Sequence, residues 1–271
     1  MPYATSADGA LIYYETHGAG PAVLFVHGSG GHHAAWWQQV PHLRDRFTVV
    51  TLDLRGFGRS DSTMAEYDSR AFPDDIAAVL DAAGIARAVL VGQSIGAAAA
   101  LKAALLDPAR AAGVVLAHSL GGIDHPDLAA RVRADRAEAE KLPVLDRLLT
   151  PRFRAADPAR TFLFQQMGTF NTAKMADLRN LNTDGPTAAE VVASGIPICL
   201  LAGENDAVLR PATVRAAAAL LPGATLDIVT AAPHSMYWET PELFNAALDR
   251  FLTSVYGAEL PGALSSSGAS A

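Results

Sequence analysis

The chain has 271 residues, half of them hydrophobic, and a formal net charge of −7 at pH 7. This length fits one α/β domain with an insertion, and the apolar content is ample for a large core. The negative charge gives no basic face for nucleic acid, and no charge-free apolar stretch is long enough to span a bilayer. The N-terminus does not resemble a signal peptide, and the single cysteine, Cys199, cannot form an intrachain disulfide. We therefore expect a protein of the reducing cytoplasm that binds neither nucleic acid nor membrane.

The first third of the chain predicts alternating strands and helices. Residues 11–16 and 47–52 are expected to be strands, and residues 35–43 a short helix. A further helix is predicted to open at Phe72-Pro73-Asp74-Asp75, since proline suits a first turn and acids suit the positive end of the helix dipole, and to stop at Gly84. This alternation is typical of a parallel sheet.

A glycine-rich loop follows the apolar run at residues 23–26, which predicts a buried strand. The loop reads His27-Gly28-Ser29-Gly30-Gly31. Glycines just past a strand end let backbone N–H groups face a cavity, so we expect an oxyanion loop there. A flexible loop without chemistry is the alternative. The segment lacks the Lys-Ser/Thr ending of a P-loop and the spacing of a dinucleotide-binding motif.

The segment Gly92-Gln93-Ser94-Ile95-Gly96 is the most informative stretch of the chain. It lies between an apolar run at residues 88–91 and an alanine-rich run at 97–106, which predict a strand and a helix. A G-x-S-x-G sequence at such a turn indicates a nucleophile elbow that exposes Ser94 in a cleft. The expected oxyanion hole then pairs the N–H groups of Ser29 and Ile95.

A serine nucleophile needs a base and a group that orients the base. Among the eight histidines, His234 lies late in the chain, after a predicted strand at residues 225–229. His118 ends the run at residues 114–116 and is kept as a pocket-lining alternative. His27 is expected to brace the oxyanion loop, whereas His32 and His33 are expected at the pocket. The other three, His17, His42 and His125, have the character of surface or turn residues.

The orienting acid is expected to be Asp206, which follows a buried-strand pattern at residues 197–202. A carboxylate there can bond the far nitrogen of the imidazole and stabilise its charged form. Glu204 and Asp124 are rivals for this role, and a turn or helix cap is the purely structural alternative for each. The histidines suggest a metal only weakly, because no carboxylate or cysteine completes a recognisable ligand set in the sequence.

The order Ser94, Asp206, His234 resembles that of the α/β-hydrolase superfamily. Further matches are the His27 loop, the segment Asp53-Leu54-Arg55-Gly56-Phe57-Gly58-Arg59-Ser60, and Pro233 to Glu239. The resemblance implies a mostly parallel eight-stranded sheet flanked by helices, with an inserted helical cap. We expect the core in residues 1–120 and 195–258, the cap in residues 121–194, and a disordered tail in residues 259–271.

The insertion is expected to be helical at residues 128–142, 161–167, 173–181 and 187–192, without a convincing strand. Its large apolar side chains either pack the cap on the core or line a pocket; they are Phe153, Phe162, Phe164, Met167 and Phe170. The residues that we expect at the pocket are His27, Gly28, Gly30, Trp36, Trp37, Gln93, His118, Phe162, Met167 and Met236.

These features predict a cofactor-independent serine hydrolase that cleaves a small, largely apolar carboxylic ester or lactone through an acyl-enzyme. Relatives with an aspartate nucleophile are excluded by Ser94. A carbon–carbon bond hydrolase of ring-fission dienones is an alternative, although that group has Asn and Trp where this chain has Gln93 and Ser235. A cofactor-free perhydrolase is another alternative, and a ligand-binding receptor on the same fold is a remote one.

Overall fold

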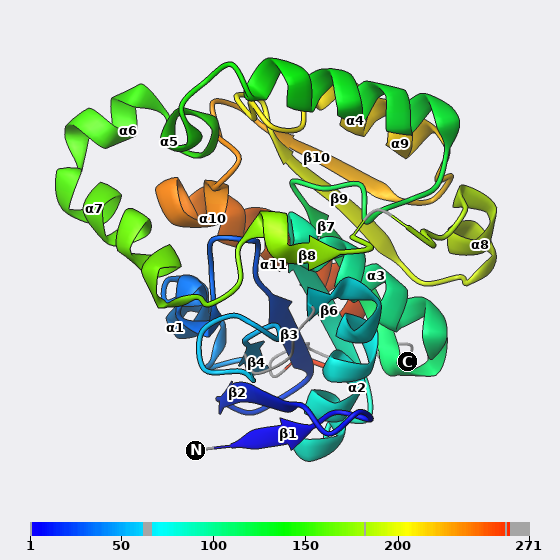
Figure 1. Cartoon of the computed structure of the whole chain (residues 1–271). Helices are drawn as coiled ribbons and strands as arrows, with labels where there is room; N and C mark the ends of the chain where they lie inside the picture. Colours follow the sequence, from blue (N-terminus) through cyan, green and yellow to red (C-terminus); the bar gives the residue numbers. More distant parts are fainter. Residues whose placement is uncertain (1, 62–66, 182, 258, 261–271) are drawn as a thin grey trace, which may run out of the picture.

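The computed structural model describes residues 2–61, 67–181, 183–257 and 259–260 (Figure 1). Its centre is an eight-stranded sheet with the order β1-β2-β4-β3-β6-β7-β9-β10. Strands β1, β2 and β4 pair antiparallel, and all other neighbours pair parallel. This confirms the predicted sheet. The strands are β1 (Tyr3–Thr5), β2 (Leu11–His17), β3 (Ala22–Val26), β4 (Thr48–Leu52), β6 (Ala88–Gln93), β7 (Ala111–Ala117), β9 (Ile198–Gly203) and β10 (Thr225–Val229).

The central strands β3, β6, β7 and β9 are buried along their whole length. Strands covered on both faces need continuous apolar runs, which is what made them visible in the sequence. Two apolar clusters lie on opposite faces of the sheet. Helices α2 (Phe72–Ala82), α3 (Ile95–Leu106) and α9 (Pro211–Ala219) contribute to one cluster, and helices α1 (Gln39–Leu43), α10 (Met236–Glu239) and α11 (Pro241–Tyr256) contribute to the other.

Between β7 and β9 the described residues are mainly helical, as expected. Three of these helices begin at side-chain caps, in which Thr150, Asp157 and Thr187 accept a backbone N–H. Figure 1 shows α5, α6 and α7 on the side of the sheet that carries α10, and α4 beside α9. The assignment of this segment as a cap stays a prediction. Its helices are α4 (Pro126–Ala139), α5 (Val144–Leu148), α6 (Pro151–Ala156), α7 (Pro158–Met167) and α8 (Ala188–Ala193).

Two local predictions in this fold were wrong. The helix expected at residues 173–181 is replaced by a short 3₁₀ turn and strand β8 (Leu178–Arg179), which pairs parallel with β5 (Tyr67–Asp68). The helix expected at residues 35–43 is split into a 3₁₀ turn (His33–Trp36) and α1. Pro41 explains the split, because it has no N–H to donate to a preceding turn.

The tail predicted to be disordered lies outside the described residues apart from residues 259–260. Of the helices that the structure describes, none combines the length and the apolar character needed to cross a bilayer.

A buried ion pair fixes the loop after β4 to α2. The Arg55 guanidinium, 2% exposed, donates to both carboxylate oxygens of Asp75 at 2.8 and 2.5 Å and also reaches Asp8 at 2.6 Å. Removing the Asp75 charge takes away the fully buried one of these two carboxylates and weakens the compensation of the buried Arg55 charge.

We therefore expect Asp75→Asn to lower the free energy of unfolding by about 3 kcal/mol, measured by urea denaturation. The control is Glu138→Gln, which breaks the exposed pair with Lys141 and is expected to leave the midpoint of urea denaturation nearly unchanged. Equal effects of the two changes would contradict the structural role given to Asp75.

Candidate functional site

Ser94 occupies a strained turn between β6 and α3. Its φ of 53° and ψ of −117° lie in a region that non-glycine residues rarely adopt. The neighbouring glycines are required by space: a Cβ at Gly92 would lie 2.4 Å from the Cα of Ala97, and one at Gly96 would lie 2.4 Å from the carbonyl oxygen of Val26. The turn therefore has the tight geometry that its sequence predicts for a nucleophile elbow.

Asp206 and His234 are in direct contact. Asp206 follows β9, His234 follows β10, and the Nδ1 of His234 lies 3.0 and 2.9 Å from the two carboxylate oxygens. The backbone N–H groups of Val208 and Leu209 donate to Oδ1 of Asp206 at 2.8 and 2.9 Å. An ionised carboxylate only accepts, so the proton of the pair sits on Nδ1 and leaves Nε2 of His234 available as an acceptor.

The carboxyl of Asp206 is kept ionised. Burial alone would raise its pKa, but the charge and hydrogen bond of His234, with the hydrogen bond of His118, outweigh burial and hold the pKa well below its usual range. The two rival carboxylates lie elsewhere. Glu204 is exposed and accepts the N–H of Ala231. Asp124 is exposed, and its backbone forms an isolated β-bridge with that of Thr187.

Ser94 and His234 line the same cavity, which has a volume of about 310 Å³. Its wall comes from the loop after β3, the elbow, helices α5 and α7, and the loop after β10. Among these described lining residues there is no lysine, arginine, aspartate or glutamate. They are Gly28, Ser29, Gly30, Gln93, Ser94, Val144, Leu145, Leu148, Phe164, Gln165, Gly168, His234, Ser235 and Tyr237.

The two predicted oxyanion donors lie next to the elbow. Ser29 lines the cavity, and Ile95 begins α3, where the first N–H groups of a helix have no intrahelical partner. The loop approaches the elbow closely, because a Cβ at Gly28 would lie 2.0 Å from Oε1 of Gln93 and 3.3 Å from Cβ of Ser94. A side chain at position 28 would therefore have to displace the Gln93 amide and would crowd Ser94.

His27 braces this loop from below, as expected, and does not line the cavity. Its Nδ1 lies 2.7 Å from the carbonyl oxygen of Gly28, to which it donates, and its Nε2 accepts the N–H of Leu54 at 3.0 Å. A second ring proton, on Nε2, would face the N–H of Leu54, so the charged form of His27 is disfavoured. Complete burial lowers the pKa of His27 to about 4, so this imidazole is neutral in the folded protein.

The neutral state of His27 predicts a pH dependence of stability. The unfolded chain takes up this proton near pH 6.5, whereas the folded protein takes it up only near pH 4, so acid favours unfolding across this window. Stability from His27 is complete above about pH 6.5, and about 3 kcal/mol is lost as pH falls through 4. The free energy of unfolding, measured by urea denaturation between about pH 7 and pH 4, should fall less steeply with decreasing pH for His27→Asn than for the wild type. The same pH dependence in both proteins would contradict this account.

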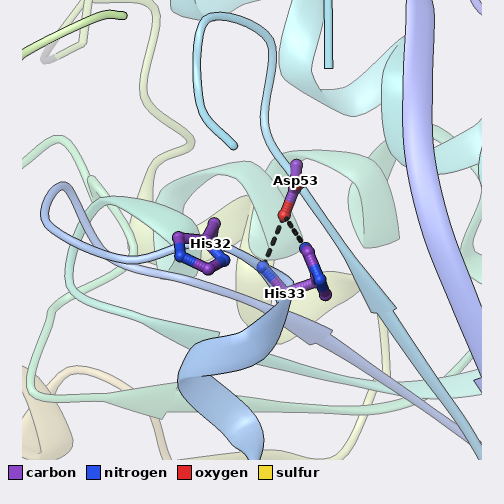
Figure 2. Close-up of side chains that lie close together, drawn as sticks. All are labelled: His32, His33 and Asp53. Atoms are coloured by element: carbon purple, nitrogen blue, oxygen red, sulfur yellow. Dashed lines mark hydrogen bonds and ion pairs between the residues drawn. The ribbon is translucent and has the colours of Figure 1, made fainter. Parts of the chain in front are cut away.

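A second cluster of side chains connects the loop after β3 to the loop after β4 (Figure 2). The Asp53 carboxylate accepts two hydrogen bonds from His33, one from the backbone N–H at 2.5 Å and one from the ring Nδ1–H at 2.8 Å. It also accepts the backbone N–H of Arg59 at 2.8 Å. Figure 2 shows the His32 ring beside this pair without a bond to either residue. Burial would raise the pKa of Asp53, but the bond and charge of His33 outweigh burial and lower it.

This cluster corrects one prediction, because a carboxylate does join the histidines. Ligand atoms of His32, His33 and Asp53 lie within 4.8 Å of one another. A cation at Asp53 would, however, have to displace N–H groups that already point at both carboxylate oxygens. We therefore interpret the group as a hydrogen-bonded brace.

Only some of the residues expected at the pocket line the cavity. Gly28, Gly30 and Gln93 line the cavity, whereas Trp36 is buried against Phe25 and Tyr237, and Phe162 faces outward with 63% of its surface exposed. Trp37 is also exposed, and His118 is turned toward Asp206. The expected residues outside the lining are His27, His32, His33, Trp36, Trp37, His118, Phe162, Met167 and Met236.

Most of the apolar wall was missed. Val144, Leu145 and Leu148 come from α5, and their spacing of one and four residues is the signal that could have shown one helix face. Ser235 and Tyr237 follow His234 and could have been taken from that motif.

The inserted segment is bonded directly to the loop and helix that follow β10. The N–H of Ser235 donates to the carbonyl oxygen of Leu148 at 3.0 Å, and Thr150 donates to Glu239 through its N–H and hydroxyl at 2.7 and 2.5 Å. Nε1 of Trp238 donates to the carbonyl oxygen of Arg160 at 3.2 Å. The part of the inserted segment that lines the cavity and the segment that carries His234 are therefore packed together.

Comparison with known proteins agrees with the fold. Residues 21–241 match the family of the alpha/beta hydrolase fold, and the chain belongs to this family. It is a hydrolase of that type. The chain is 30% identical to a putative carbamate hydrolase, RutD, of Caulobacter sp. (strain K31), over 92% of this chain and 97% of the relative.

Two solved structures are also similar. A thermophilic esterase from Thermogutta terrifontis superposes with a TM-score of 0.80 at 26% identity, covering 94% of this chain and 98% of the esterase. An enol-lactonase from Burkholderia xenovorans LB400 gives a TM-score of 0.78 at 23% identity, covering 93% of this chain and all of that one, and it shows a shared fold.

Proposed function

We propose that this protein is a cofactor-independent serine hydrolase that cleaves a carboxylic ester or lactone through an acyl-enzyme. The observation that carries the proposal is the bond between Nδ1 of His234 and the Asp206 carboxylate, with His234 and Ser94 lining one cavity. The similarity in sequence and fold to a thermophilic esterase supports the ester as substrate.

The proposed reaction begins with attack of Ser94 Oγ on the substrate carbonyl carbon while Nε2 of His234 takes the hydroxyl proton. Asp206 stabilises the resulting imidazolium. The N–H groups of Ser29 and Ile95 bind the oxyanion, and one such donor typically contributes about 3 kcal/mol to the transition state. The imidazolium returns the proton to the departing alcohol. His234 then deprotonates a water that cleaves the acyl-enzyme and regenerates Ser94.

The cavity favours a small and uncharged substrate. Its volume of about 310 Å³ is at the lower end of ligand sites, and its α5 and α7 side supplies mainly aliphatic and aromatic contacts. The polar lining groups, such as Gln93, Gln165 and Tyr237, are neutral and can orient a substrate by hydrogen bonds. A carboxylate on the substrate would be buried without a cationic partner, which is costly.

A fluorophosphonate probe combined with a substrate panel tests this function. We expect the probe to label Ser94, as located by peptide mass spectrometry, and p-nitrophenyl esters of short acyl chains or small lactones to be hydrolysed. Dienone cleavage without ester turnover would instead indicate a carbon–carbon bond hydrolase, and peroxide-dependent bromination in acetate would indicate a perhydrolase. Ligand binding without labelling or turnover would indicate a receptor.

We also propose the cytoplasm as the compartment. The single cysteine, Cys199, supports this as a core residue without a disulfide partner, and burial raises the pKa of its thiol to about 11.

A further inference from the structure

His118 is a second imidazole on the Asp206 carboxylate. It follows β7, and its side chain is fully buried with Nδ1 2.9 Å from Oδ2 of Asp206. Its φ of 54° is in the left-handed region, and its N–H donates to the carbonyl oxygen of Leu201 at 2.7 Å. A non-glycine residue persists in this conformation only where its surroundings hold it there.

The protonation of His118 follows from its partners. Burial is the main cause that lowers the pKa of this imidazole, so it is neutral and carries one proton. Since an ionised carboxylate only accepts, that proton sits on Nδ1 and donates to Asp206. The Nε2 of His118 is buried and has no hydrogen-bond partner within the described part of the chain.

Asp206 thus accepts from four donors supplied by three parts of the chain. These are His118 after β7, the amides of Val208 and Leu209 after β9, and His234 after β10. The rings of His118 and His234 lie 5.5 Å apart, on the same carboxylate. The titratable groups that face His118 from the surrounding loops are therefore Asp206 and His234.

We propose that His118 is a positioning residue that acts through Asp206 on His234. Its Nδ1–H holds the carboxylate in place and draws negative charge away from the oxygens that His234 contacts. A carboxylate relieved of some charge stabilises an imidazolium less, so the bond from His118 limits how strongly Asp206 supports the charge that His234 acquires during proton transfer. This inference rests on the proposed roles of Ser94, Asp206 and His234. His118 does not line the cavity, so it acts on the base and not on substrate binding.

Two substitutions separate this role from simple packing. In His118→Asn the side-chain Nδ2 takes the branch position of the imidazole Nδ1 and keeps a donor, and asparagine tolerates a positive φ. In His118→Leu a methyl group takes that position and the donor is lost. The control is His42→Asn, which removes an exposed imidazole paired with Asp249.

We expect the acid-side midpoint of the pH profile of kcat/KM to rise by about one pH unit in His118→Leu, with KM unchanged. In His118→Asn and His42→Asn the midpoint should move by less than about 0.3 unit. An unshifted midpoint in the leucine variant, or an equal shift in the asparagine variant, would overturn the proposal.

Nitrogen-15 NMR of the wild-type imidazoles gives a second test that needs no stable leucine variant. We expect one histidine, assigned by its loss in His118→Asn, to remain the neutral Nδ1–H tautomer from pH 7 to pH 9. A proton on Nε2, or titration of this ring within that range, would overturn the proposal. The NMR result is independent of turnover, whereas full activity of Ser94→Ala would reject the proposed function itself.

Discussion

Replacement of Ser94 by alanine is expected to lower kcat for a small activated ester by about 10⁴-fold to 10⁶-fold, because the proposed nucleophile is lost while the cavity and the proposed oxyanion donors remain. The change removes one oxygen from a side chain that is only partly buried, so the fold should be retained. Steady-state hydrolysis of p-nitrophenyl acetate measures the loss, and mass spectrometry should find no acyl adduct in the variant.

Ser29→Ala is the matched control, since Ser29 lines the same cavity. Its proposed contribution is a backbone N–H, which alanine keeps, and we expect activity to fall by less than about tenfold. If Ser29→Ala abolished turnover while Ser94→Ala remained active, the nucleophile would have been assigned to the wrong serine.

Asp206→Asn is expected to lower kcat by about 10⁴-fold, because the amide can donate to Nδ1 of His234 and so favour the wrong tautomer. The substituted side chain keeps an oxygen that can accept the N–H groups of Val208 and Leu209, so the loop should stay folded. The measurement is kcat for the same ester, with thermal unfolding to confirm the folded state.

Glu204→Gln controls for a change of charge in the same loop. Glu204 is exposed and contacts the N–H of Ala231, so the variant should stay within about twofold of the wild-type kcat. The assignment of the acid to Asp206 would be wrong if the glutamine variant lost activity and the asparagine variant did not.

The sheet was predictable because its signals are local. Strands such as β6 and β9 are buried on both faces and need unbroken apolar runs, and the turn at Ser94 needs glycine on both sides. The polar groups that follow successive strands could then be expected at one edge of the sheet. The contact of His234 with Asp206 follows from this topology.

Other features depend on contacts between distant parts of the chain. Strand β8 pairs with β5 across more than a hundred residues, so neither two-residue strand has a periodic signal of its own. The cavity wall depends on how α5 and α7 pack over the elbow, and the sequence analysis wrongly placed Phe162, which is exposed, at the pocket instead of Phe164, which lines the cavity. His118 was placed correctly after a strand, but its positive φ and its bond to Asp206 were not visible.

The bond from the N–H of Ser235 to Leu148 has a consequence for how this enzyme can diversify. Leu148 lines the cavity, and its carbonyl oxygen also accepts the hydrogen bond from Ser235, the residue next to His234. A larger or smaller side chain in place of Val144, at the start of α5, would alter the shape of the cavity without breaking this hydrogen bond. Remodelling the backbone around Leu148 would disturb both the cavity wall and the position of Ser235 next to His234, so insertions or deletions at this end of the helix should cost more activity than side-chain replacements.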